Sequence, residues 1–298
     1  MTQALETPEA WRAAGDVIPV GGHDIFVLDT GGGDAGRQTI FVLHGFPTAG
    51  WDFHLVLPGL AAQYRVVIPD MLGFGFSAKP RPHSYSIPEQ ADLMEGVIAA
   101  LNLGPAHVLA HDYGDTVAQE MLARDNARPS GARLFRSLCL LNGGLFPEMH
   151  RARLIQKLLA GPLGGLVNRL STQGRFDKSF AAVFGAHTRP SRGELDAFWR
   201  LINANDGRHV FTSLIGYMAE RRANRQRWLD ALVAAHCPVQ LVNGSDDPVS
   251  GAHMVARYRD LVRADDDIIE LPGIGHYPQV EAPDAVARAC LAFFQLNM

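Results

Sequence analysis

One stretch constrains the fold of this chain more than any other, and it runs over residues 107–120, HVLAHDYGDTVAQE. The apolar run over residues 107–110 predicts a buried strand, and the apolar spacing after Gly114 predicts a helix. The five residues AHDYG between them place Ala110 and Gly114 two positions before and after Asp112. Small residues at these positions are typical of a nucleophile elbow, a sharp turn that raises one side chain at the edge of a parallel sheet.

The residue at the apex of this turn is Asp112, where a serine would be more usual. A serine needs a base to become a nucleophile, but an aspartate with a reference pKa of about 4 is already ionised at neutral pH. Its attack on an acyl carbon yields only an anhydride, whereas its attack on an alkyl carbon yields an ester that water can cleave. The sequence therefore predicts a substrate with an electrophilic alkyl carbon. The alternative is that Asp112 only caps the following helix, since aspartate is a favoured N-cap residue.

Composition excludes several other classes of function. The chain has 298 residues, which suits one large domain or a domain with an insertion. A net charge of −4 and a pI near 6.3 give no reason to expect nucleic acid or an anionic membrane as partner. Cys139, Cys237 and Cys290 lie in apolar contexts without metal-ligand spacing, so we expect buried thiols in a reducing compartment. No metal and no cofactor is indicated.

The ends and the apolar runs of the chain carry no membrane signal. The first residues, MTQALETPEAWRAAG, lack the basic start and apolar run of a secretory signal. No apolar run reaches the roughly 18 residues that a membrane span needs. We therefore expect a cytoplasmic protein, a monomer or homodimer, that acts on a small apolar organic substrate and water.

Short apolar runs alternate with helical segments along most of the chain. Residues 17–20 and 23–30 flank Gly21-Gly22 and predict a β-hairpin. Further strands are predicted at residues 39–43, 65–68, 138–141, 239–242 and 268–271, and a closing helix at 281–296. This alternation favours a mostly parallel sheet covered by helices on both faces. From 147 to 227 only helical spacing remains, which predicts a helical lid (147–227) between two parts of an α/β core (1–146 and 228–298).

The loop after the strand at 39–43 reads His44-Gly45-Phe46-Pro47. Gly45 would let the backbone approach a ligand, and Pro47 would fix the turn. A loop of this form beside an elbow commonly supplies one of two N–H groups that bind an oxyanion, so we assign these donors to Phe46 and Tyr113. We interpret His44 as a structural histidine that bonds the loop backbone, with a direct role in the reaction as the alternative.

Two later loops complete a set of reactive side chains. Asp247 follows the strand at 239–242, and His276 follows the strand at 268–271. Because the carboxyl ends of parallel strands meet at one edge of a sheet, these side chains can meet Asp112. The order nucleophile, acid, histidine is that of the α/β-hydrolase triad. Asp246 competes with Asp247 for the acid role, and Asp247 is preferred because it directly precedes Pro248-Val249, which is the form this loop takes in the family that the chain resembles.

These motifs resemble the Asp-nucleophile branch of the α/β-hydrolase superfamily, which epoxide hydrolases and haloalkane dehalogenases share. The resemblance covers the chain from about Val17 and rests on HGFP at 44–47, Asp70 with GFGFS at 73–77, HDYG at 111–114, DP at 247–248 and GH at 275–276. It implies an α/β-hydrolase fold, with a mostly parallel eight-stranded sheet and a helical lid inserted after strand 6. A closer likeness, through HDYGDTVAQE, LNGGLFPE and TRP at 188–190, is to the mesoderm-specific transcript subgroup and its bacterial relatives.

The resemblance also implies a mechanism. Asp112 would form an alkyl ester, and His276, oriented by Asp247, would activate the water that cleaves it. The N–H groups of Phe46 and Tyr113 would hold the oxyanion.

The leaving group separates the two activities of the branch. An epoxide needs a proton donor such as a lid tyrosine, and Tyr217 lies where one is expected. A second lid tyrosine is missing, because Phe198 and Trp199 stand in that region. A halide needs N–H donors, commonly a tryptophan after the nucleophile and an asparagine in the first loop, where this chain has Tyr113 and Phe46. The candidates for contact with substrate or leaving group are Tyr217, Trp199 and His44.

The sequence therefore favours an epoxide hydrolase and keeps other readings open. A haloalkane dehalogenase would use the same ester mechanism. An ester hydrolase or lactonase would use Asp112 as a base, and a binding module would keep the fold without chemistry.

Overall fold

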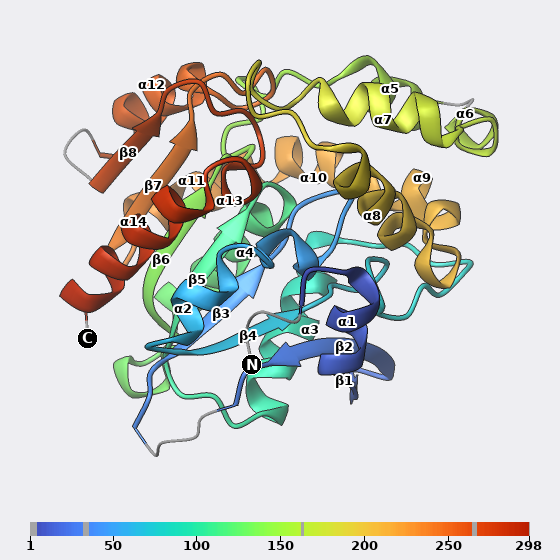
Figure 1. The fold of residues 1–298 in the computed structure, drawn as a ribbon. Helices are drawn as coiled ribbons and strands as arrows, with labels where there is room; N and C mark the ends of the chain where they lie inside the picture. The colour runs from blue at the N-terminus through green and yellow to red at the C-terminus, as the bar shows by residue number, and fades with distance from the viewer. Residues whose placement is uncertain (1–4, 32–35, 162–163, 264–266, 298) are drawn as a thin grey trace.

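An eight-stranded sheet forms the centre of the computed structural model, which describes residues 5–31, 36–161, 164–263 and 267–297 (Figure 1). The strand order is β1-β2-β4-β3-β5-β6-β7-β8. β2 pairs antiparallel with β1 and β4, and all other neighbours are parallel. The predicted α/β-hydrolase fold is confirmed. The strands are β1 Asp16–Val20, β2 His23–Asp29, β3 Thr39–Leu43, β4 Arg65–Pro69, β5 Ala106–His111, β6 Phe135–Leu141, β7 Val239–Gly244 and β8 Asp267–Leu271.

Helices cover both faces of this sheet, which explains why β3 and β5 are buried along their whole length. Successive side chains alternate between the faces, so Val108 packs in one apolar cluster and Leu109 in the other. The first cluster includes α3 Ile87–Ala100, α4 Tyr113–Asn126, α11 Arg225–Val233 and α12 Ala252–Leu261. The second includes α1 Pro8–Ala14, α2 Leu57–Ala61 and α14 Pro283–Leu296.

The predicted hairpin is confirmed at the edge of the sheet. Its turn residues, Gly21 and Gly22, have φ angles of 57° and 82°. Two successive positive φ angles are typical of the turn that matches the twist of paired strands, and glycine adopts them without steric cost.

The predicted helical segment lies between β6 and β7. It contains α5 Leu154–Leu159, α6 Gly164–Arg169, α7 Gln173–Ala181, α8 Arg192–Asn203, the 3-10 helix η4 Ala204–Val210, α9 Phe211–Leu214 and α10 Tyr217–Ala223. In Figure 1 these helices lie beyond the arrowheads of the parallel strands, over the edge where the carboxyl ends meet. α11 follows and packs against α4, so the chain has returned to the sheet by then. The division at 147 and 227 stays a prediction.

Two further observations concern the composition. Cys139, Cys237 and Cys290 are buried and free, as predicted, and the Sγ atoms of Cys139 and Cys290 are 3.8 Å apart. Among the helices of the described ranges, none combines the length and the apolar character needed to cross a membrane.

Candidate active site

Asp112 stands at the turn between β5 and α4, with φ 47° and ψ −100°. A positive φ is rare for a residue with a Cβ, and it persists only where the surrounding structure enforces it. A Cβ at Gly114 would lie 2.3 Å from the carbonyl oxygen of Leu43, so only glycine lets α4 start this close to β3. The Asp112 side chain makes no capping bond to α4. The alternative that it serves only as an N-cap is therefore wrong.

The first loop contacts the Asp112 carboxylate directly. The backbone N–H of Phe46 donates to Asp112 Oδ2 at 3.2 Å. Tyr113 is the first residue of α4, and a first-turn N–H has no partner within its own helix. The two N–H groups expected to bind an oxyanion are therefore those of Phe46, which bonds the Asp112 carboxylate, and of Tyr113, which directly follows Asp112 in the chain.

His276 faces the same carboxylate from the loop after β8. Its Nδ1 bonds Asp247 Oδ2 at 2.7 Å, and its Nε2 lies 4.0 Å from Asp112 Oδ2. Asp246 does not take this place, because its Oδ1 accepts from the N–H of Gly273 at 3.3 Å. The structure thus brings Asp112, His276 and Asp247 together, with His276 between the two carboxylates, as the sequence suggested.

Three further groups fix the Asp247 carboxylate. Asn142 Nδ2 and Ser250 Oγ donate to Oδ2 at 2.9 and 2.8 Å, and the N–H of Val249 donates to Oδ1 at 2.7 Å. Both oxygens are therefore satisfied, and the carboxylate is held in the orientation that receives His276. Asn142 directly follows β6, and this position at a strand end is the only feature of the sequence that could have marked it as a residue of the site.

Glu281 holds the loop that carries His276. Its carboxylate accepts the N–H groups of Gly275 at 2.8 Å and Tyr277 at 3.0 Å, on either side of the histidine. It also accepts the N–H of Gly185, at 2.8 Å, from the helical segment between β6 and β7. No pattern in the sequence marks this residue, because a glutamate in the first turn of a helix is ordinary.

The buried charges shift one another's pKa values. Burial alone would lower the pKa of His276, but the charge of Asp247, its hydrogen bond and the charge of Asp112 raise the pKa to about 9. Burial would raise the pKa of Asp247, yet His276 and the hydrogen bonds lower it to about 2. The pKa of Asp112 is lowered in spite of burial, chiefly by His276 and Arg221. These shifts favour a resting site in which the imidazolium of His276 lies between the carboxylates of Asp112 and Asp247.

Arg221, on α10, is a site residue that the sequence analysis missed. Its side chain is 2% exposed, and its Nη2 donates to the carbonyl oxygen of Asp112 at 2.9 Å and lies 3.4 Å from Oδ1. Its Nε donates to Thr116 Oγ1 at 2.8 Å, and its guanidinium lies 4.6 Å from the centre of the Tyr217 ring. No motif surrounds Arg221 in the sequence, so only the fold shows that it pairs with Asp112.

The first loop shows what surrounds Gly45 and His44. The space beside Gly45 is filled by protein, because a Cβ there would lie 2.5 Å from Nδ1 of His111. Gly45 is therefore needed for packing against His111, and its expected role in ligand approach stays a prediction. The Nε2 of buried His44 accepts from the N–H of Met71 at 3.0 Å, and its Nδ1 bonds Gly45 O at 2.9 Å. Both nitrogens of His44 hold backbone, as the structural interpretation expects.

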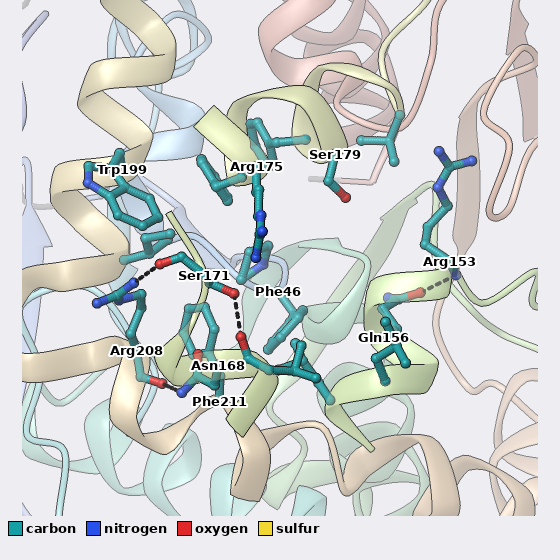
Figure 2. A pocket seen from close by; sticks show the side chains of 18 of the residues that line it. Phe46, Arg153, Gln156, Asn168, Ser171, Arg175, Ser179, Trp199, Arg208 and Phe211 are labelled. Carbon is teal, nitrogen blue, oxygen red and sulfur yellow. Dashed lines mark hydrogen bonds between the residues drawn. The ribbon is translucent and has the colours of Figure 1, made fainter. Parts of the chain in front are cut away.

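An apolar cavity of about 400 Å³ opens over the site. Phe46 and His276 line it, and Asp112, which is 3% exposed, contacts both. Figure 2 shows Phe46 behind a ring of side chains from the helices between β6 and β7. The apolar residues that line the cavity include Leu159, Val167, Phe176, Phe180, Ile202 and Phe211. The cavity has a volume typical of sites for small organic molecules.

The two aromatic candidates for leaving-group contact lie in different places. Trp199 lines the cavity (Figure 2). Tyr217 is buried, with its ring packed on Phe46 and Tyr113. Its hydroxyl approaches the cavity-lining Gln156 without a hydrogen bond of standard geometry, and burial raises its pKa well above the usual value. The roles of both residues stay predictions.

Outside this site, the described residues contain one trio that could hold a metal ion. It consists of His23, His83 and Glu89, whose donor atoms lie within 4.8 Å of one another. Both Glu89 oxygens bond His83 Nε2, at 2.8 and 3.0 Å, and this pairing accounts for the trio without an ion.

The parallel sheet, the strained elbow and the adjacent His–Asp pair together define a class of hydrolases. Residues 40–289 match the Alpha/beta hydrolase family, and the chain belongs to it.

Relatives and solved structures agree with this assignment. The chain is 41% identical to the mesoderm-specific transcript homolog protein of Bos taurus, over 95% of this chain and 87% of that protein. It is 42% identical to the putative hydrolase LipZ of Mycobacterium tuberculosis, over 95% and 96%. A haloalkane dehalogenase variant from Bradyrhizobium elkanii has a TM-score of 0.78 at 22% identity, covering 95% and 96%. A putative lipase from Acinetobacter baumannii has a TM-score of 0.80 at 18%, covering 99% and 95%.

Proposed function

We propose that this hydrolase opens an epoxide through a covalent alkyl ester on Asp112, as in the Asp-nucleophile branch of its family. The observation that carries the proposal is an ionised carboxylate at the apex of an elbow, with one oxygen on the Phe46 N–H and 4.0 Å from His276 Nε2. The apolar cavity above it suits an apolar alkyl substrate. The relative LipZ is named a putative hydrolase, which agrees with hydrolysis in general.

In the first step, an oxygen of Asp112 attacks an epoxide carbon while the carbon–oxygen bond of the ring breaks. The ring oxygen becomes an alkoxide and needs a proton. His276 lines the cavity and is protonated in the resting site, so it donates this proton, with the Tyr217 hydroxyl as a second candidate. The products of this step are a hydroxyalkyl ester on Asp112 and a neutral imidazole.

In the second step, the neutral His276 removes a proton from water, and the hydroxide adds to the ester carbon of Asp112. Esterification has removed the negative charge of Asp112 that helped to raise the pKa of His276, so the imidazole stays in the neutral form that can accept a proton. The N–H groups of Phe46 and Tyr113 hold the oxyanion. Collapse releases the alkoxide, which takes the proton of the new carboxyl group and leaves as a diol, and the resting charges return.

A haloalkane dehalogenase is the second candidate, and one observation favours it. Trp199 lines the cavity, and its indole N–H is a donor of the kind that stabilises a departing halide. The first step would then release halide instead of forming an alkoxide, and the second step would be unchanged.

The intact mass of a His276→Phe variant, incubated with separate panels of epoxides and haloalkanes, tests the proposal. Without its base the second step stalls, whereas the alkoxide of the first step still takes its proton from the Tyr217 hydroxyl, so the ester forms and stays on the enzyme. An epoxide adds its whole mass, whereas a haloalkane adds its mass less that of the hydrogen halide. We expect the epoxide adduct, located by peptide mapping on Asp112.

The matched control is the double variant Asp112→Ala/His276→Phe, which should give no adduct. An adduct that persists in this control, or the absence of any adduct from both panels, would reject the ester mechanism. Ester hydrolysis that survives Asp112→Ala would instead favour an ester hydrolase, and an adduct from haloalkanes alone would favour the second candidate.

A further inference from the structure

The cavity lining has a charge pattern that its apolar character does not explain. Besides His276, three charged side chains line it: Arg153, Arg175 and Arg208. The lining contains no aspartate or glutamate within the described residues. An apolar cavity therefore carries an excess of positive charge although the whole chain has a net charge of −4.

These three arginines also lack acidic partners in the described part of the chain. Arg175 Nη1 donates to the carbonyl oxygen of Leu170 at 3.2 Å. Arg208 Nη1 donates to the carbonyl oxygen of Ser171 at 2.6 Å, and its guanidinium lies 5.1 Å from the centre of the Trp199 ring. Backbone oxygens and an aromatic face orient these guanidinium groups, but they do not neutralise them.

Arg192, on α8 of the same helical segment, shows the usual arrangement for comparison. Its guanidinium pairs with Asp177 at 2.7 Å and with Asp196 at 2.8 Å. Acidic side chains are therefore present in this segment, and these two pair with an arginine that does not line the cavity.

The placement of Arg175 separates the cavity into two chemical zones. Figure 2 shows its side chain extending from α7 into the space between the lining side chains, and the residue is solvent-exposed. An exposed guanidinium keeps its hydration, whereas a charge among the phenylalanines deeper in the cavity would lose it. A fitting ligand therefore has an apolar body near Phe46 and His276 and an anionic group at the rim. The guanidinium fork suits a carboxylate or a phosphate oxygen pair.

We propose that the substrate is an amphiphile whose apolar chain carries the reactive carbon and whose single anionic head group binds Arg175, in a cavity lining that also carries the positive charges of Arg153 and Arg208. This inference rests on the proposed function for the reactive carbon, but the anionic head group follows from the cavity alone. A carboxylic acid and a phosphate monoester share the required chemistry.

Binding of unreactive ligands tests the head group without any reaction. Isothermal titration calorimetry of the wild-type protein would compare decanoate, decyl phosphate and neutral decanol. We expect at least one anion to bind about tenfold more tightly than decanol, and its affinity to fall about tenfold in Arg153→Gln/Arg175→Gln. The two anions distinguish a carboxylate from a phosphate ligand. Lys178→Gln, an exposed cation on α7 outside the cavity lining, is the matched control and should leave the affinity unchanged.

Equal affinity for the anions and decanol, no binding of any ligand, or no change in the double arginine variant would overturn the inference. A trapping experiment separates this failure from failure of the proposed function. The His276→Phe variant would be incubated with decanoic acid that carries a terminal epoxide and, separately, with the methyl ester of this epoxide. Anion binding without adduct from either compound would reject the mechanism and keep the head-group site. Equal adduct formation from both compounds, unaffected by the arginine substitutions, would keep the mechanism and reject the amphiphile.

Discussion

The Asp112 carboxylate is surrounded by two cations that come from different parts of the chain. Arg221 lies 3.4 Å from Oδ1, and His276 Nε2 lies 4.0 Å from Oδ2. Together they keep the carboxylate ionised in a buried site, where desolvation alone would favour the neutral acid. Because Arg221 also bonds the Asp112 carbonyl oxygen, we regard it as a positioning residue for Asp112.

We predict that Arg221→Gln moves the acid limb of kcat/KM to higher pH by about one unit, because the carboxylate loses one of its two stabilising charges. The measurement is the pH dependence of turnover of an epoxide that the trapping experiment identifies. Arg222→Gln is the matched control, since Arg222 is an exposed cation on the same helix. A merely structural role would lower the activity equally at all pH values and leave the limb in place.

At the scale of elements, α10 and α4 fix the geometry of the site. Glu220 and Arg221 are consecutive on α10, and Glu220 Oε2 accepts the N–H of Ile87 at the start of α3 at 3.0 Å. α10 is therefore tied to the sheet-covering helices at the point where Arg221 reaches Asp112. α4 starts directly against β3, and this contact sets the elbow.

We predict that Gly114→Ala destabilises the protein by about 2–3 kcal/mol, because its Cβ meets the Leu43 carbonyl oxygen at 2.3 Å and backbone must move. The free energy of unfolding in denaturant measures the effect. Gly174→Ala, on α7, is the control of opposite sign, because nothing lies within 4 Å of its Cβ. That substitution should be neutral or stabilise the helix by about 0.5 kcal/mol. Equal effects of the two substitutions would refute the close contact between α4 and β3.

At the scale of the whole molecule, the buried charges link stability to pH. The pKa of His276 is raised to about 9, so the folded protein binds more protons than the unfolded chain above the ordinary histidine pKa. Its contribution to stability is complete below about pH 6.5 and is lost as the pH rises through about 9. The pKa of Asp247 is lowered to about 2, so its contribution is present above about pH 4 and is lost as the pH falls through about 2.

We predict that the contribution of His276 and Asp247 to the free energy of unfolding is greatest between about pH 4 and pH 6.5. It should fall on the alkaline side by on the order of 3 kcal/mol, which is the shift of the His276 pKa converted to free energy. Urea denaturation between about pH 5 and pH 10 measures this. In His276→Phe the alkaline decline should largely disappear, and an unchanged decline would assign it to other groups.

Much of the fold and the central residues of the site follow from local patterns in the chain. Apolar runs between breakers mark the strands, and their alternation with helical spacing predicts the sheet because parallel strands need helical crossovers. Asp112, Asp247 and His276 could be picked out because each follows a strand, and the carboxyl ends of parallel strands meet at one edge.

Arg221, Glu281 and the arginines of the cavity needed the tertiary structure. Arg221 lies 109 positions from Asp112 in the chain, and Gly185 lies 96 positions from Glu281. Helical spacing shows that a segment is helical, but it does not show which residue of that helix meets which distant partner. The sequence by itself therefore determined the α/β core and the candidate nucleophile, whereas tertiary packing decided what surrounds Asp112, because long-range side-chain contacts leave no periodic trace along the chain.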